Sequence, residues 1–172
     1  MKEMLRYGFI LSLICIVAAG LLAGVNVLTR SKILAQTQAE EEASLQEVMP
    51  EATHFLAVKS GEEVLYYKAY DQTGKLIGAA FKAQGKGYSS TIETMVGMLK
   101  DGTITVIKIL SQNETPGLGA RVAESSFTGQ FRNKKDLGGV QAITGATISS
   151  KAVIDSVKKK SAEVKARLEN EK

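Results

Sequence analysis

The chain has 172 residues and carries 22 Lys and Arg against 18 Asp and Glu, a formal net charge of +4. This length holds one membrane or targeting segment and one domain of ordinary size. Cys15 is the single cysteine and His54 the single histidine, which excludes an internal disulfide and a zinc or iron-sulfur ligand set. With these ligands missing we expect no metal site. The basic residues are dispersed without interleaved aromatics, so we expect no nucleic-acid partner.

The N-terminal part of the chain is strongly apolar. Residues 7–29 contain no charged residue and would span roughly 33 Å as a helix, which is enough to cross a bilayer. A cleaved signal peptide is the competing interpretation, because small residues occur at 18–20, but the apolar run is longer than a usual signal core. We therefore predict a short tail over residues 1–6 and a retained transmembrane helix over residues 7–29. Basic residues flank both ends of the span, so charge alone does not set its orientation.

Residues 30–50 are predicted to form a juxtamembrane helix and linker. Apolar residues recur at helical spacing between Ile33 and Val48, and Pro50 ends the segment. A single domain with a C-terminal helix is predicted over residues 51–172.

Two β-hairpins are predicted in the first half of this domain. The first has strands over residues 64–70 and 76–83 with a Gly-containing turn between them. The second has strands over residues 94–99 and 103–109, joined by an Asp-Gly turn. Between the hairpins, the glycine-bearing segment 85–92 is either a long turn or the wall of a pocket.

Loops and helices complete the predicted domain, whose fold class is α+β with an antiparallel sheet and flanking helices. In the loop 111–119, a proline and two glycines enforce an irregular backbone with exposed amides, which suits anions or flat aromatic ligands. A short helix is predicted over residues 125–131, with Phe127 and Phe131 in the core. A C-terminal helix is predicted over residues 147–169. The apolar residues assigned to one side of it are Ile148, Ala152, Val153, Val157, Val164 and Leu168.

The run from Thr144 to Ser150 reads Thr-Gly-Ala-Thr-Ile-Ser-Ser and stands where the chain turns into this last helix. Gly145 and Ala146 leave Thr147 without bulky neighbours, so another enzyme or a ligand phosphate could approach its hydroxyl. A helix N-terminus stabilises anions, and a phosphate carried by Thr147 would lie there. The alternative is that Thr144 or Thr147 only caps the helix, which is a common role for threonine.

The same segment resembles the flavinylation motif of the FMN-binding domains in the RnfG and NqrC subunits of bacterial respiratory complexes. The resemblance implies that Thr147 carries FMN through a phosphoester bond, placed by a flavin transferase that uses FAD as donor. It also implies that Thr144, Gly145 and Ala146 form the close approach to the phosphate, with Ile148 beside them. Thr147 would be modified rather than catalytic, and no catalytic residue is predicted.

Two further segments strengthen the resemblance, which covers nearly the whole chain and is closest to RnfG. The Glu-Thr-Pro-Gly-Leu-Gly run resembles the family's loop against the flavin, and the Gly-Tyr pair before Ile92 resembles its glycine-tyrosine segment. These segments add the following predicted FMN contacts, for which turn structure is the alternative: Glu114, Thr115, Gly117, Leu118, Gly119, Gly87 and Tyr88. Tyr88 either stacks near the ring or is an ordinary half-buried tyrosine.

The chain departs from the family pattern at several positions. Gln141 stands six residues before Thr147, where the family often has an acidic residue, and this would weaken recognition by a transferase. Residues 111–113 are Ser-Gln-Asn where a histidine is frequent, and Ser90 replaces a frequent glycine.

The resemblance implies an electron-carrier subunit of a membrane-bound, ion-translocating ferredoxin:NAD oxidoreductase of the Rnf type. The flavin domain would lie on the outer face of the cytoplasmic membrane, and the partners would be the other subunits, the flavin transferase and membrane lipid. The alternatives are an NqrC-like subunit of a sodium-pumping quinone reductase, a stand-alone membrane-anchored FMN carrier, and a non-redox binding or structural domain.

Overall fold

The computed structural model describes residues 2–61 and 63–170. The chain divides into two compact units, residues 1–41 and residues 42–172. Helix α1, Lys2–Val48, includes all the described residues of the first unit and the beginning of the second. It runs unbroken through the predicted membrane span and through most of the predicted linker, ending at Val48. The predicted domain boundaries stay predictions.

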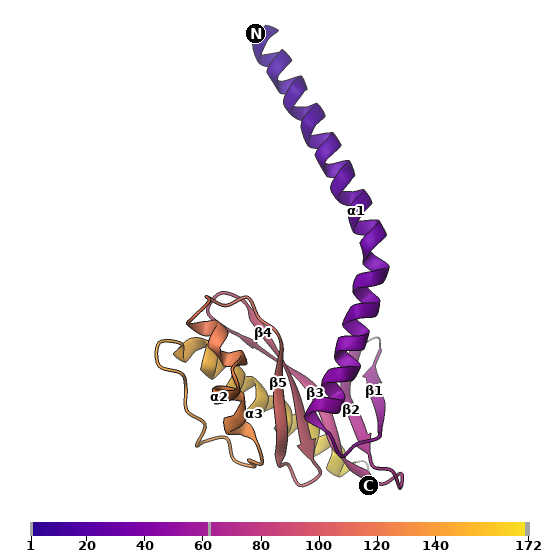
Figure 1. The fold of residues 1–172 in the computed structure, drawn as a ribbon, viewed down its shortest axis with the longest axis vertical. Helices are drawn as coiled ribbons and strands as arrows, with labels where there is room; N and C mark the ends of the chain where they lie inside the picture. The colour runs from indigo at the N-terminus through magenta and orange to yellow at the C-terminus, as the bar shows by residue number, and fades with distance from the viewer. Residues whose placement is uncertain (1, 62, 171–172) are drawn as a thin grey trace. The chain divides into compact units, whose positions relative to one another are not determined.

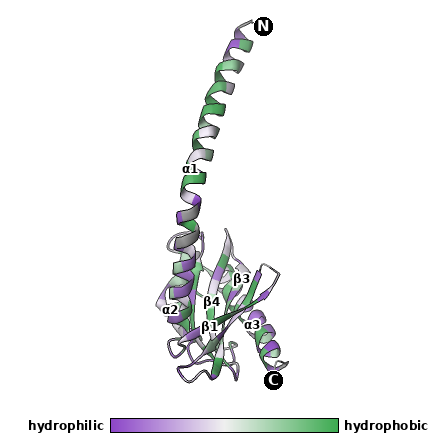
Figure 2. Ribbon diagram, turned by 90° about the vertical axis from the view of Figure 1, so that its right-hand side faces the viewer, coloured by the Kyte–Doolittle hydropathy of each residue, from purple (hydrophilic) through white to green (hydrophobic). Residues whose placement is uncertain are grey.

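The first unit contains one helical stretch, Glu3–Arg30, with a mean hydropathy of 2.5, long and apolar enough to cross a membrane. Figure 2 shows mostly apolar residues along this part of α1. Large apolar side chains are exposed along it, including Phe9 and Leu22, each 72% exposed. A helix that is apolar all round and not buried in protein suits lipid rather than water.

The second unit is built on a five-stranded antiparallel sheet in which each strand pairs with the next one in the chain. The strands are β1 His54–Ser60, β2 Glu63–Tyr70, β3 Leu76–Lys86, β4 Thr91–Leu99 and β5 Ile104–Ser111. This arrangement confirms the predicted α+β class and both hairpins. Strand β1 was not predicted, because its sequence has no clear alternation; it is an edge strand whose backbone pairs with β2, from His54 opposite Tyr70.

Strands β3 and β4 are longer than predicted, and the connection between them is short. Of the two alternatives for residues 85–92, the long turn is wrong, because β3 continues to Lys86 and β4 begins at Thr91, and Tyr88 of this segment lines a cavity. Gly85 opposes Ile92 in this register and lies under the C-terminal helix α3, Thr147–Asn170. Only residues 87–90 are left to turn the chain.

Replacing Gly85 should loosen the contact between β3 and α3. A Cβ at this position would overlap the carbonyl oxygen of Ala152 on α3. We expect Gly85→Ala to lower the free energy of unfolding by about 2 kcal/mol. Gly129→Ala, at a position with open space around the added Cβ, is the matched control. Denaturant unfolding followed by circular dichroism measures both, and equal losses would contradict the assignment.

The two faces of the sheet pack against different elements. On one face, α3 contributes Val153, Val157 and Val164 to a core that includes Phe81 and Val96 of the sheet. Figure 1 shows α3 lying along this side of the strands. The opposite face packs against residues 45–49, where the Thr105 hydroxyl donates to the Val48 carbonyl oxygen at 2.6 Å and Lys108 pairs with Glu47.

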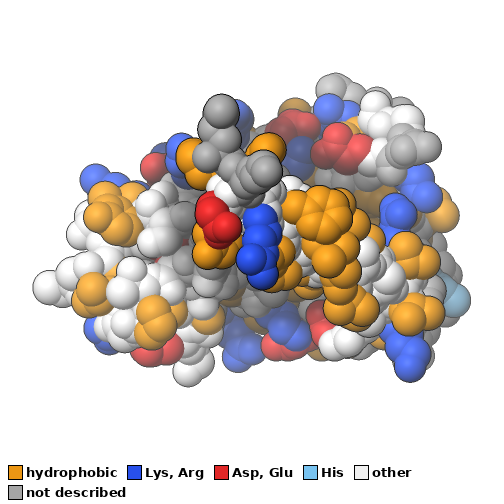
Figure 3. All heavy atoms as spheres, turned by 90° about the horizontal axis from the view of Figure 1, so that it is seen from above, with side chains coloured by type: hydrophobic (Ala, Val, Ile, Leu, Met, Phe, Trp, Pro, Cys, Tyr) orange, Lys and Arg blue, Asp and Glu red, His pale blue; other side chains and the backbone are white. Residues whose placement is uncertain are grey.

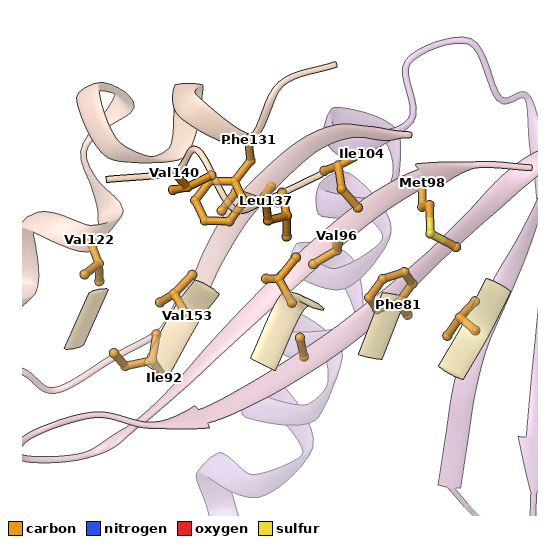
Figure 4. Packing of buried hydrophobic residues seen from close by; sticks show 14 of the residues in the cluster. Phe81, Ile92, Val96, Met98, Ile104, Val122, Phe131, Leu137, Val140 and Val153 are labelled. Carbon is orange, nitrogen blue, oxygen red and sulfur yellow. The ribbon is translucent and has the colours of Figure 1, made fainter. Parts of the chain in front are cut away.

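Short helices follow β5 and close the end of the larger core. These are the 3-10 helix η1 Gly119–Ala123, the single α-turn α2 Ser125–Thr128 and the 3-10 helix η2 Gly129–Phe131. Phe127 and Phe131 are buried and meet edge to face with their ring centres 5.5 Å apart, which confirms their predicted place in the core. Figure 4 shows Phe131, Leu137 and Val140 gathered beside Val96 of the sheet.

The apolar side predicted for the last helix is largely buried, except at its beginning. Val153, Val157 and Val164 are buried, but Ile148, which was predicted on the same side and as a cofactor contact, is 56% exposed. Ile148 lies in the first turn of α3 and lines a cavity there.

Thr94 on β4 carries a buried hydroxyl that has no hydrogen-bond partner among the described residues. Thr94→Val keeps the shape and removes the unpaired oxygen. We expect it to raise the free energy of unfolding by about 1 kcal/mol. Thr105→Val should do the reverse, because it deletes the donor to the Val48 carbonyl. A loss of stability in Thr94→Val under denaturant would show that its hydroxyl is satisfied after all.

Charged side chains of both signs share the surface. On the face in Figure 3, Lys and Arg side chains lie beside Asp and Glu. Along α3, Glu163 pairs with both Lys160 and Arg167 at 3.2 Å. Exposed pairs of this kind contribute only a few tenths of a kcal/mol each to stability.

Candidate functional site

Three segments that are far apart in the sequence meet around one cavity of about 450 Å³. They are the β3–β4 connection, the loop after β5 and the first turn of α3 with the residues before it. The residues lining the cavity are Tyr88, Glu114, Thr115, Leu118, Gly119, Gly145, Ala146, Thr147, Ile148 and Ser149. This volume falls in the range of small-molecule sites.

Most of the residues predicted to contact a cofactor are in this wall, although they come from separate motifs of the sequence. Gly87, Gly117 and Thr144 are also predicted contacts but do not line the cavity. Gly87 and Gly117 serve the shape of adjoining loops: a Cβ on Gly87 would meet the carboxylate of Glu114, and Gly117 has a φ of +75°. Ser149 lines the wall, and the sequence motifs assign it no role.

A tight turn leads the chain into α3. The N–H of Ala146 donates to the carbonyl oxygen of Ile143 at 2.9 Å, and Gly145 between them has a φ of +83°. A positive φ at the third turn position favours glycine, because other residues are strained there. The turn places Thr147 at the first helical position, with its side chain exposed.

Capping does not account for Thr147. The first helical hydrogen bond runs from the N–H of Ser150 to the carbonyl of Ala146 at 2.9 Å, so Ala146 is the residue at the N-cap position. The Ser150 hydroxyl accepts from the N–H of Ile143 at 3.0 Å and donates to the carbonyl of Ala146 at 2.9 Å. Within residues 2–61 and 63–170, the hydroxyls of Thr144 and Thr147 have no hydrogen-bond partner.

The start of α3 is suited to an anion. An α-helix leaves its first N–H groups without carbonyl partners, and here these belong to Thr147, Ile148 and Ser149. Together with the helix dipole, such groups stabilise a negative charge placed beside them. Thr147 lines the same cavity as Ile148 and Ser149.

Glu114 is buried, with 5% of its surface exposed, and its carboxylate is fully engaged. It accepts hydrogen bonds from the N–H groups of Tyr88 at 3.1 Å, Ser89 at 2.9 Å and Ser90 at 2.9 Å. It also accepts from the hydroxyls of Ser90 at 3.3 Å and Ser149 at 2.6 Å. One side chain thus joins the β3–β4 connection to the first turn of α3.

These hydrogen bonds keep Glu114 ionised. Burial by itself raises the pKa of its carboxyl group, but the bonds from the Ser149 hydroxyl and from the N–H groups of Ser90, Ser89 and Tyr88 outweigh burial and lower the pKa from 4.5 to about 2. The cavity wall therefore contains a fixed negative charge at neutral pH.

Apolar side chains surround the cavity. Leu118 is 50% exposed, Ile148 56% and Tyr88 73%. Exposed apolar side chains beside a concave site are typical of ligand-binding surfaces. There is no room for a side chain at Gly119, because a Cβ there would come within 2.7 Å of both Glu114 Oε2 and Ser149 Oγ.

A phosphate, a chain and a flat ring can all be accommodated by these residues. The free N–H groups and the unengaged Thr147 hydroxyl suit the phosphate end, and the apolar side chains suit a flavin ring. The residues present therefore fit FMN.

All three departures from the family pattern take part in local hydrogen bonds. The Ser90 hydroxyl accepts from the N–H of Asn113 at 2.8 Å while it donates to Glu114, and Gln112 Oε1 accepts from the N–H of Glu114 at 2.7 Å. The backbone of Gln141 exchanges two hydrogen bonds with the side chain of Gln130. Ser90 and Ser149 both stand within the sequence motifs, which could have marked them as site residues. The sequence gives no sign that both hydroxyls donate to Glu114.

Comparison with known proteins decides the family. The profile of the FMN-binding domain matches residues 87–161, and that of the RnfG N-terminal region matches residues 1–48. The G subunit of an ion-translocating oxidoreductase complex from Methanosarcina acetivorans is 35% identical, over 91% of this chain and 92% of the relative. The chain belongs to the RnfG family of ion-translocating oxidoreductase complexes.

Another member of the RnfG family is the G subunit of a proton-translocating ferredoxin:NAD(+) oxidoreductase complex from Clostridium ljungdahlii. It is 34% identical, over 86% of this chain and 84% of the relative. The crystal structure of NqrC from Shewanella oneidensis superposes with a TM-score of 0.50 and 20% identity, covering 69% of this chain and 74% of that one. The chain therefore shares its fold with NqrC. Every residue that lines the cavity falls inside the matched FMN-binding domain.

Proposed function

We propose that this chain is the membrane-anchored electron-carrier subunit of an Rnf-type ion-translocating ferredoxin:NAD oxidoreductase complex, with FMN joined to Thr147 by a phosphoester bond. The names of its relatives and its FMN-binding domain support the electron-carrier role. The observation that carries the attachment is the exposed Thr147 hydroxyl, which is free of protein hydrogen bonds within the described residues, on the cavity wall at the start of α3.

Each part of the cavity has a task in this proposal. The N–H groups at the start of α3 stabilise the phosphodiester charge, and Gly145 and Ala146 keep the approach to Thr147 open. Leu118, Ile148 and Tyr88 hold the ring by apolar contact, excluding water from its faces. The bound FMN supplies the redox chemistry by accepting and passing on electrons. The chain alone is a redox subunit rather than a complete enzyme.

Attachment would be the work of a flavin transferase with FAD as donor. A bond forms between Thr147 Oγ1 and the phosphorus of the FMN half, the pyrophosphate bond of FAD breaks, and AMP leaves. The proton of the hydroxyl passes to a base of the transferase or to solvent. The exposed position of Thr147 admits an enzyme of this kind.

The apolar stretch Glu3–Arg30 would anchor the chain in the cytoplasmic membrane as a single pass. The FMN domain would lie on the outer face, among the other subunits of the complex and membrane lipid. Its relatives, as subunits of translocating complexes, support this location in a membrane assembly.

The test is the intact mass of the full chain co-expressed with a flavin transferase. We expect one addition, equal to FMN less one water, on the entire population. A denatured gel band should also fluoresce, because a covalent flavin survives denaturation. A chain of unmodified mass from cells in which the transferase is active on another substrate would overturn the attachment.

A further inference from the structure

The three segments that form the cavity wall have one side chain in common. Glu114 belongs to the loop after β5, and its carboxylate accepts from the backbone of residues 88–90 and from Ser149 on α3. The β3–β4 connection and the first turn of α3 are thereby both hydrogen-bonded to the loop after β5. The hydrogen bonds span 24 to 35 residues of sequence, so they join elements that local structure does not connect.

The β3–β4 connection depends on this carboxylate for its order. Apart from the bond between the N–H of Gly87 and the carbonyl of Ser90 at 2.8 Å, the N–H groups of residues 88–90 all point to Glu114. Three successive N–H groups around one anion form a concave anion site of a known kind. Here the anion belongs to the protein itself, and it is ionised at neutral pH.

Ser90 adds a second connection that belongs to this chain in particular. Its hydroxyl accepts from the N–H of Asn113 and donates to Glu114, so it bridges the same two loops beside the carboxylate. Ser90 does not line the cavity. It therefore offers a way to weaken the connection without touching the surface that a flavin would contact.

We propose that Glu114 is a positioning residue that holds the three walls of the flavin cavity in their binding arrangement before the flavin arrives, with Ser90 as its auxiliary. The part of the inference that concerns the flavin rests on the proposed function. The part that concerns the preformed walls rests on the hydrogen bonds alone. A preformed site costs less conformational entropy on loading, and it keeps the reactive hydroxyl and the ring surface in register. Glu114 acts in this way through the loops and not through contact with the reacting atoms.

The first measurement needs no flavin. Hydrogen exchange of the full chain in detergent, without flavin, should be at least about tenfold faster at the amides of residues 88–90 in Glu114→Gln than in wild type. Ser90→Ala and Ser149→Ala each remove one hydroxyl from the carboxylate and should give smaller increases at the same amides. Ser89→Ala keeps its backbone N–H, which is its bond to Glu114, and should match wild type.

The second measurement uses the flavin-loaded chain. At equal flavin content, the visible circular dichroism of the attached flavin should weaken in Glu114→Gln, because the ring is held less firmly. A residue that only stabilises the fold would leave this signal unchanged in folded protein. If Glu114→Gln does not fold, Ser90→Ala and Ser149→Ala carry both measurements.

The outcomes separate the two proposals. Exchange at residues 88–90 that is unchanged in all the variants that fold overturns the positioning role, whatever happens to the flavin. A visible signal that is unchanged while exchange accelerates also overturns it, because the walls would then not control the ring. A wild-type chain to which no flavin becomes attached overturns the proposed function. The hydrogen-exchange result then decides by itself whether Glu114 holds the walls in place.

Discussion

Replacing Thr147 by alanine is expected to remove all covalently bound flavin from the chain. The hydroxyl is the only group in the proposed bond that the protein supplies, so its loss should be complete rather than partial. In-gel fluorescence and intact mass after co-expression with a flavin transferase measure the result. Thr147→Ser keeps a hydroxyl at the first position of α3 and should still be modified.

The matched control for this variant is Thr91→Ala. Thr91 is also exposed, at the start of β4, and its hydroxyl has no hydrogen-bond partner in the part of the chain that the structure describes. Thr91 lies away from the cavity wall, so its variant should carry as much flavin as wild type. A flavin addition that survives in Thr147→Ala would place the bond on another residue and end the assignment.

Replacing Glu114 by glutamine is expected to lower the free energy of unfolding at pH 7 on the order of 3 kcal/mol. The pKa of Glu114 is about 2 in the folded chain against 4.5 for an ordinary glutamate, so the folded state favours the ionised form. The resulting stability is fully present above pH 4.5 and is lost as the pH falls from 4.5 toward 2, because the unfolded chain binds the proton more readily. Glu114→Gln should therefore be less stable at pH 7 and less sensitive to acid below pH 4.5.

Denaturant unfolding of the full chain in detergent, followed by far-ultraviolet circular dichroism over this range of pH, measures both effects. Glu51→Gln is a suitable control, because Glu51 is exposed and has no ion pair or hydrogen bond from its side chain within the described residues. It should follow wild type at each pH. The same acid sensitivity in Glu114→Gln as in wild type would mean that other carboxyl groups account for it.

Features that depend on neighbouring residues could be predicted from the sequence. The hairpin around Asp101 and Gly102 is one example, because an Asp-Gly turn between alternating strands has few other ways to fold. The turn through Gly145 into α3 is another, since glycine and a following helical pattern specify it locally. Strand β1 could not be predicted in this way, because an edge strand is stabilised by its partner β2 and not by its own pattern.

The candidate site was predicted as separate motifs with individual contacts. The position of Leu118, Tyr88 and Ile148 around one cavity follows from the fold, which brings two loops to the start of α3. Their contact with a flavin stays a prediction. The exposure of Ile148 illustrates the limit of periodicity, because the helical pattern placed it on the same side as the buried Val153 and Val157, whereas in the folded chain it lines the cavity.

The sequence by itself determined the long apolar helix and the hairpins of the antiparallel α+β class, since the patterns that specify them lie within a few positions of one another. The small-residue approach to Thr147 stays a prediction. Only the tertiary structure decided what Glu114 does. The sequence placed it in a loop and predicted a flavin contact, which stays a prediction. In the folded chain its carboxylate is surrounded by N–H and hydroxyl groups from residues 88–90 and from Ser149. Partners so distant in sequence meet only after the sheet and α3 have packed, because no local pattern of residues brings them together.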